Sequence, residues 1–175
     1  MQTLVLLAGL YFRIGIGPGY PVATLTPPPG EESSSSSGPG VNTELAAGAT
    51  VRPRLVVGLG TFPMASPAPS YDGADAGGQH VSGTGPFIAY WLRERGGLHL
   101  QAGLLFAAGY LDGSDTRDAH VGFGYGGMAG VGYDRFISDT WSVGGLARVT
   151  AYRLYGVDDS IRIAAPALLV TFTHH

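Results

Sequence analysis

The sequence contains no cysteine and no lysine, and it has few charged residues of any kind. Without cysteine, the chain can form neither disulfides nor thiolate metal sites. All 10 basic residues are arginine, and the formal net charge of −3 gives no support for a nucleic-acid partner. Charged residues make up 13% of the chain, about half of the share in ordinary soluble domains. The composition is therefore unusual for a soluble globular protein.

Long apolar runs are also missing. No stretch approaches the roughly 18 uninterrupted apolar residues of a membrane-spanning helix, and no segment combines a helical period with helix caps. The first ten residues, MQTLVLLAGL, are apolar but lack the basic segment of a secretion signal. We expect them to lead directly into a first strand. At 175 residues, the chain is large enough for one domain or a small barrel.

Glycine, by contrast, is abundant, with 29 residues. The stretch HVGFGYGGMAGVGYDRF, residues 120–136, contains the G-x-G-x-x-G spacing of dinucleotide-binding turns. Such a turn also needs a strand before it, a helix after it and an acidic residue about 20 residues further on. Here the glycines continue at 122, 124, 126, 130 and 132, between apolar residues. Period two is the repeat of a strand, so the stretch predicts a strand with one bare face.

Reading the whole chain for period two gives eight candidate strands. They cover 9–25, 41–52, 54–64, 83–94, 98–111, 120–136, 141–155 and 160–173. Several are longer than the usual 5–6 residues of soluble sheets, and such lengths suit tilted strands that cross a bilayer. The pattern assigns no faces to 54–64 and 83–94.

The connections between these segments alternate in length. The three tight ones lie around Pro53, around Gly96 and Gly97, and around Ser138 and Asp139. The four longer ones cover 27–40, 65–82, 112–119 and 156–159. In an up-and-down meander, all short turns then lie at one end and all longer loops at the other, which is the layout of outer-membrane barrels. An even number of strands places both chain ends on the short-turn side.

Charge follows the same division. Nine acidic residues fall in the longer loops: Glu31, Glu32, Asp72, Asp75, Asp112, Asp115, Asp118, Asp158 and Asp159. The short turns and their flanks carry Arg52, Arg54, Arg93, Arg95 and Arg135. The chain thus has charged ends and an almost uncharged middle. We predict an all-β fold, an eight-stranded antiparallel up-and-down transmembrane β-barrel that forms one domain over 1–175.

The two faces of the strands differ in kind. One face is apolar and carries aromatic residues toward its ends, which predicts aromatic girdles on a lipid-facing surface: Phe12, Tyr20, Tyr110, Phe123, Tyr133, Trp141 and Phe172. The other is mostly glycine and alanine with isolated polar residues, and it suits the cramped interior of an eight-stranded barrel. A soluble lipocalin-like barrel would also alternate, but it would need a more polar exterior.

At this point the chain resembles the small bacterial outer-membrane β-barrels of the OmpA, OmpX and OmpW kind. The resemblance covers nearly the whole chain and includes a last strand, PALLVTF, that ends at the aromatic Phe172. In that family the assembly machinery reads a terminal aromatic, whereas this chain continues through Thr173, His174 and His175. The resemblance implies an outer-membrane location with both termini in the periplasm.

Seven polar residues are predicted to face the interior: Arg13, Glu44, His99, Gln101, Arg148, Thr150 and Tyr152. A charge enclosed in a narrow barrel must be paired, because burying it alone costs several kcal/mol. We therefore expect a salt-bridge and hydrogen-bond network that closes the lumen. The alternative is a narrow path for ions or small solutes, gated by an arginine–glutamate pair.

Two motifs invite other chemistry. His80-Val81-Ser82 resembles the His-x-Ser of outer-membrane lipid A deacylases, in which histidine acts as the base for serine. That family has an asparagine directly after the serine, and here Gly83 follows. The aspartates of LDGSDTRD, 111–118, lack the order of an EF-hand calcium loop. The segment 27–40, PPPGEESSSSSGPG, has the composition of a flexible outer loop.

These observations predict an outer-membrane barrel with a structural, envelope-anchoring or loop-mediated interaction role. We expect no catalysis, no cofactor and no metal. The expected partners are the lipid bilayer and lipopolysaccharide, with no nucleic acid, and the barrel is expected to be a monomer. A narrow pore, a lipid-modifying enzyme that uses His80 and Ser82, and a soluble lipocalin-like barrel remain as alternatives.

Overall fold

Strands make up almost all of the described chain. The computed structural model describes residues 9–26, 33–67, 69–71, 74–75, 78–93, 97–111, 120–156 and 160–175. The strands are β1 (Gly9–Gly19), β2 (Val22–Thr26), β3 (Ser34–Ser37), β4 (Gly40–Arg52), β5 (Leu55–Ser66), β6 (Ser70–Tyr71), β7 (Ala74–Asp75), β8 (Gln79–Trp91), β9 (Gly97–Leu111), β10 (His120–Phe136), β11 (Trp141–Tyr155) and β12 (Ser160–His174). The described residues contain no helix that is long and apolar enough to cross a membrane.

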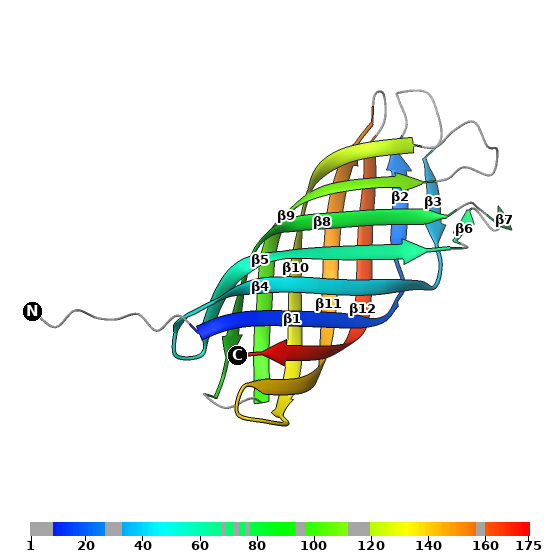
Figure 1. The fold of residues 1–175 in the computed structure, drawn as a ribbon. Helices are drawn as coiled ribbons and strands as arrows, with labels where there is room; N and C mark the ends of the chain where they lie inside the picture. The colour runs from blue at the N-terminus through cyan, green and yellow to red at the C-terminus, as the bar shows by residue number, and fades with distance from the viewer. Residues whose placement is uncertain are drawn as a thin grey trace, which may run out of the picture.

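The strands close into a barrel (Figure 1). Neighbours pair antiparallel in the order β1, β4, β5, β8, β9, β10, β11, β12, and β12 pairs back onto β1 and β2. β1 and β2 form one long strand that is interrupted at Tyr20 and Pro21, and β3 and β4 are interrupted in the same way at Gly38 and Pro39. Proline has no N–H for the ladder, which accounts for both interruptions. The predicted fold class, a closed eight-stranded antiparallel barrel, is confirmed.

The observed strand bounds follow the predicted segments closely, with instructive exceptions. The segments 120–136 and 141–155 have the bounds that were predicted for them. Within 27–40, expected to be loop, Ser34–Ser37 instead forms β3, which pairs with β2. The expected loop 65–82 contains β6, β7 and the start of β8. In both places an extended neighbour offers free backbone groups, and pairing with them outweighs the weak strand preference of the local residues.

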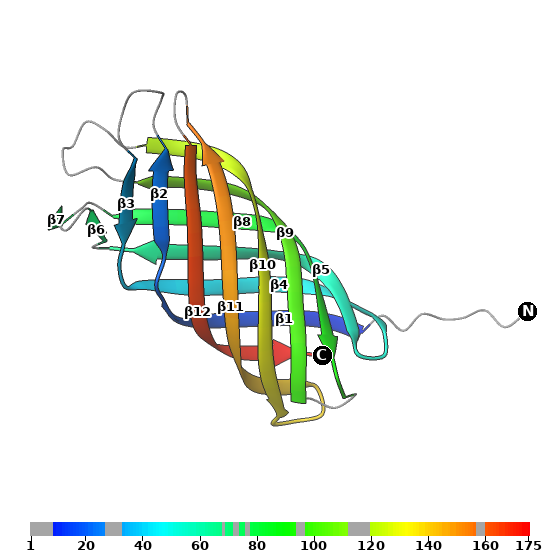
Figure 2. The ribbon, with the colours of Figure 1, turned by 180° about the vertical axis from the view of Figure 1, so that it is seen from behind.

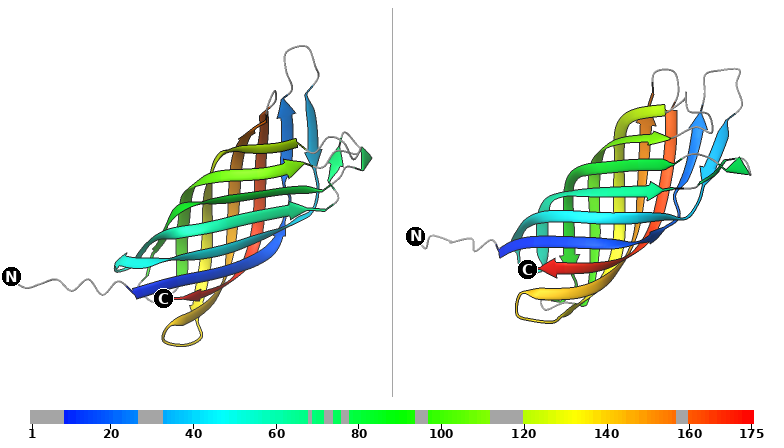
Figure 3. Two further views of the ribbon diagram at one scale, coloured as in Figure 1. Left: turned by 45° about the horizontal axis from the view of Figure 1, so that its top comes forward. Right: turned by 45° about the vertical axis from the view of Figure 1, so that its right-hand side comes forward.

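The two ends of the barrel differ. β1 begins and β12 ends at the end where short turns join β4 to β5 and β10 to β11, as Figures 2 and 3 show. We call this the short-turn end and the opposite one the loop end. Along β11 and β12, buried and exposed side chains alternate almost without exception. The buried set points into the barrel, so the core of this protein is the filled lumen.

Candidate functional site

All seven polar residues predicted to face the interior are buried inside the barrel. Each has at most 4% of its surface exposed: Arg13, Glu44, His99, Gln101, Arg148, Thr150 and Tyr152. They project from β1, β4, β9 and β11. The structure separates the charged members into two clusters, one near the short-turn end and one near the middle.

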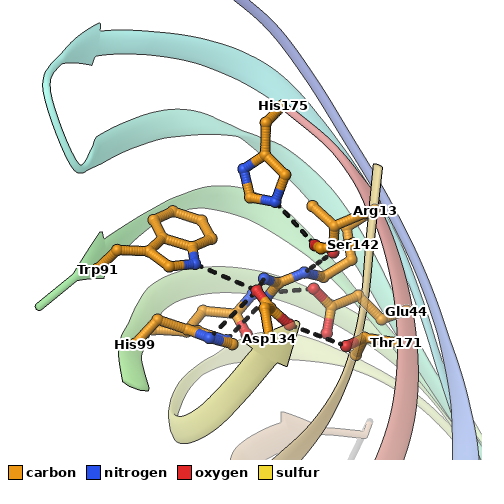
Figure 4. A network of polar contacts seen from close by, with 10 residues as sticks. Arg13, Glu44, Trp91, His99, Asp134, Ser142, Thr171 and His175 are labelled. Carbon is orange, nitrogen blue, oxygen red and sulfur yellow. Dashed lines mark hydrogen bonds and ion pairs between the residues drawn. The ribbon is translucent and has the colours of Figure 1, made fainter. Parts of the chain in front are cut away.

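The first cluster is centred on Asp134 of β10 (Figure 4). Arg13 Nη2 and Trp91 Nε1 each donate to Asp134 Oδ2 at 3.1 Å. Thr171 Oγ1 lies 3.5 Å from the other carboxylate oxygen as a donor. His99 Nδ1 lies 3.3 Å from Oδ2, and Arg13 Nη1 lies 3.2 Å from His99 Nε2. We call these residues the Asp134 cluster; Arg13 and Asp134 both have fully buried side chains.

The structure adds Asp134 to the interior residues that the sequence predicted. Asp134 lies near the end of β10, yet it is 1% exposed and has the most partners in the cluster. The alternation along β10 indicates this inward position, because Asp134 continues the inward row of Gly130 and Gly132. Trp91 was also missed, since the sequence pattern assigned no faces to 83–94.

The second cluster joins Arg148 of β11 to Glu44 of β4. Arg148 Nη1 donates to Glu44 Oε2 at 2.9 Å, and both side chains are fully buried. Gln101 Nε2 donates to the other carboxylate oxygen at 3.0 Å, and Arg148 Nη2 donates to the carbonyl oxygen of Thr43 at 3.2 Å. We call this the Arg148 cluster. Its two opposite charges neutralise each other, which is the condition for placing them in a narrow, dry interior.

Above the Arg148 cluster the interior becomes apolar. The guanidinium carbon of Arg148 lies 5.2 Å from the ring centroid of Phe62, and the Tyr152 hydroxyl donates to the carbonyl oxygen of Phe62 at 3.0 Å. A Cβ atom at Gly83 or Gly126 would come within 2.6 Å of the Tyr152 ring, so these glycines make room for it. Six apolar residues, each at most 3% exposed, then fill most of the loop end, beside the buried polar side chains of Asn42, Ser66 and Gln79: Met64, Val81, Leu105, Leu154, Ile161 and Ile163. We call them the apolar plug.

The exterior carries the residues predicted as aromatic girdles. Tyr20, Tyr110, Phe123, Tyr133 and Phe172 are exposed on the outer wall. Phe12 and Trp141 are half-buried, and the ring of Trp141 stacks on Phe172 with 4.6 Å between centroids. Between these aromatic residues, each long strand exposes large aliphatic side chains on the outer wall, including Leu59, Leu104 and Leu168. Such a continuous apolar exterior is what a bilayer requires and what water disfavours.

The histidine–serine motif has no catalytic geometry in the structure. The His80 ring stacks on Tyr110 at 5.6 Å, and the Ser82 hydroxyl lies 3.3 Å from that of Thr61, all on the half-exposed outer wall. Each residue of the proposed base–nucleophile pair thus has a different partner. The described residues hold no group of three or more metal-binding side chains. Residues 112–118 of the acidic stretch lie outside the described residues.

Comparisons with known proteins place the fold. No protein-family model and no curated protein sequence matches the chain. Among solved structures, the outer membrane protein OprG of Pseudomonas aeruginosa matches with a TM-score of 0.56 and 10% identity, covering 96% of this chain and 97% of OprG. Ail, the attachment invasion locus protein of Yersinia pestis, matches with a TM-score of 0.55 and 10% identity, and the match covers 93% of this chain and 98% of Ail.

A third structure, Neisserial surface protein A, matches with a TM-score of 0.50 and 12% identity, covering 90% of this chain and 95% of that protein. Because the identities are so low, these likenesses establish the fold and not the role. The chain has the fold of the small outer-membrane β-barrels of Gram-negative bacteria.

Proposed function

We propose that this protein is a closed outer-membrane barrel that acts through its exterior and its loops, as an envelope anchor or an interaction surface, and does not conduct solutes. The observation that carries the proposal is the filling of the interior. The Asp134 cluster, the Arg148 cluster and the apolar plug succeed one another from the short-turn end to the loop end. Eight-stranded barrels have an interior that side chains only just fill.

The apolar plug is the strongest argument against a pore. An ion or polar solute that passed it would lose most of its hydration, because the buried polar side chains at this level, such as Gln79, are few. The ion pairs below it are neutral in sum and are held by short hydrogen bonds. The apolar exterior argues against a soluble lipocalin-like barrel, because its exposed aliphatic and aromatic side chains would face water.

The difference between the two ends supports an orientation in the membrane. The short-turn end, where β1 begins and β12 ends, belongs in the periplasm, and the loop end belongs outside the cell. Because the chain lacks cysteine, single cysteines report this directly. On intact cells, a membrane-impermeant maleimide should label Ser35→Cys at the loop end. It should label Asp139→Cys, in a short turn, only after the outer membrane has been permeabilised. The reverse pattern contradicts the orientation.

Conductance tests the closed interior. The purified barrel should first show the mobility difference between boiled and unboiled samples on SDS gels that marks a folded membrane barrel. In a planar bilayer, that material should give no conductance steps. Steps that change in Arg148→Ala or Glu44→Ala would overturn the closed-barrel proposal and favour the narrow pore.

A further inference from the structure

Two arginines face each other on the outer wall near the loop end. Arg153 of β11 and Arg162 of β12 are directly paired across the two strands. Arg162 is exposed and Arg153 is half-buried, and both point away from the interior. Like charges directly opposite each other destabilise a sheet, and an anion bound between the two arginines would relieve that repulsion. Among the described residues, no carboxylate forms an ion pair with either arginine.

The flanking residues hold one of these guanidinium groups in place. The Arg153 guanidinium carbon lies 5.3 Å from the ring centroid of Tyr155, in a cation–π contact. The Tyr155 hydroxyl lies 3.2 Å from that of Tyr125, the cross-strand partner of Arg153 on β10. Arg153 Nε is buried without a hydrogen-bond partner. The contacts around Tyr155 hold the Arg153 side chain on the outer wall, where it stands opposite Arg162.

A hollow lies directly below the arginine pair. It has a volume of about 490 Å³ and is lined by both arginines, by Tyr125 and Thr24, and by small residues. Its floor is the next row of outward residues, Gly127, Ala151 and Ala164, which are paired across β10, β11 and β12. These three strands lie side by side in the barrel wall (Figure 2). The missing side-chain bulk in this row makes the depression.

A separate groove lies nearer the short-turn end on β10, β11 and β12, and it also borders Pro18, Gly19 and Tyr20. This second groove, of about 750 Å³, is lined almost entirely by apolar atoms of residues that include Ala129, Val131, Ala147, Val149 and Leu168. The outer wall over β10, β11 and β12 thus carries two cations near the loop end and an apolar trough beneath them. This is the arrangement of charge and apolar surface in an anionic lipid that stands parallel to the barrel wall.

We propose that this surface binds an anionic lipid, with its phosphate between Arg153 and Arg162 and an acyl chain in the trough. Arginine recognises phosphate through paired N–H donors, and two arginines in register offer two such forks. The trough selects a lipid over a free anion, since burying the chain adds an apolar contribution. The inference rests on the membrane location proposed above, and the orientation given there places the site in the outer leaflet.

Native mass spectrometry of the folded barrel in detergent tests the proposal, with lipid A as the probe. Zwitterionic phosphatidylcholine and inorganic phosphate serve as controls for charge and for the free ion. Lipid A should bind the unaltered protein selectively. The double substitution Arg153→Gln and Arg162→Gln should weaken binding by about tenfold or more, the scale of one lost charge-assisted hydrogen bond. The double variant Arg153→Lys and Arg162→Lys should bind lipid A with an affinity between those of the parent and the double glutamine variant. Lysine keeps the positive charge but lacks the paired N–H donors of the guanidinium group.

Two further variants separate the parts of the site. Arg135→Gln removes an exposed arginine at the short-turn end and should leave lipid A binding unchanged. Ala151→Phe fills the hollow without altering charge and should weaken binding of lipid A. The proposal is overturned if the double glutamine variant binds as the parent does, if phosphatidylcholine binds equally well, or if inorganic phosphate displaces lipid A at equal concentration. Heat-modifiable mobility on SDS gels shows separately whether the membrane barrel itself has formed.

Discussion

The two halves of the barrel interior are filled by opposite means. Toward the short-turn end, buried charges are paired at 2.9–3.1 Å across the lumen, as between Arg13 and Asp134 or between Arg148 and Glu44. Toward the loop end, apolar side chains such as Leu154 and Ile163 fill most of the space, and no buried ion pair is found there among the described residues. Both halves are filled by side chains, but only the first is held by specific ion pairs.

This difference predicts different consequences of substitution. In a buried ion pair, the attraction between the two charges roughly offsets the free energy lost when they leave water. Removing both charges therefore changes the stability little, whereas removing one leaves an unpaired buried charge and lowers the stability strongly. Apolar packing loses stability in proportion to the volume removed, whichever residue supplies it. The polar half should therefore impose the register of distant strands, because Arg13 and Asp134 lie 121 residues apart in the chain, while the apolar half fills volume.

The largest effect is expected for Asp134→Ala. The substitution leaves the Arg13 guanidinium buried without its counter-charge and removes the acceptor of Trp91. We expect a loss of about 3–5 kcal/mol in the free energy of unfolding, the range for one partner removed from a buried pair. Urea unfolding in lipid vesicles, followed by tryptophan fluorescence, measures it. A loss below that of an average apolar truncation would contradict the central role of Asp134.

The Arg148 cluster allows the comparison to be tested by a double-mutant cycle. Arg148→Leu alone leaves Glu44 with only Gln101 as a side-chain partner, and we expect a loss of about 3 kcal/mol. Combining it with Glu44→Leu should recover most of that loss, because no buried charge then remains. The same unfolding assay applies. Additive losses would show that the two side chains act independently, which the structure contradicts.

The apolar half should behave differently. Leu154→Ala should cost about 2–4 kcal/mol through the cavity it leaves. A second truncation within the apolar plug should lower the free energy of unfolding further, whereas in the polar half the second change restores stability. The check is the unfolding free energy of Leu154→Ala with and without Met64→Ala, Leu105→Ala or Ile163→Ala. Restoration by any second truncation would remove the distinction between the halves.

The sequence determines the fold more completely than the site. Alternation along 120–136 and 141–155 defined both strands to the residue, because each has one bare or polar face and one apolar face. Alternation was less informative in 83–94, where proline and glycine blur the faces and Trp91 went unassigned. It also missed β3, because four serines in a row show no alternation of polar and apolar residues; they pair with β2 along the backbone ladder.

The alternation of side chains along each strand predicted which residues face the interior, but it did not predict which of them contact one another. Which strands face each other across a barrel depends on stagger, which local patterns do not contain. The pairing of Arg148 with Glu44 follows from that stagger, as does the separation of Arg13 into another cluster with Asp134. The glycine row of β10 makes space for side chains of neighbouring strands. The structure identifies one of them, since Gly126 makes room for the Tyr152 ring.

The smallest effect should come from Thr150, a polar residue between the two halves. Its hydroxyl is buried and has no hydrogen-bond partner among the described residues. A buried hydroxyl that bonds to nothing costs free energy, whereas valine has nearly the same shape without that group. Thr150→Val should therefore raise the unfolding free energy by up to about 1 kcal/mol. Thr150→Ser keeps the hydroxyl, loses a methyl group and should be slightly destabilising. A clear loss of stability in Thr150→Val would mean that the polar half extends through Thr150, and that the boundary with the apolar half lies above it.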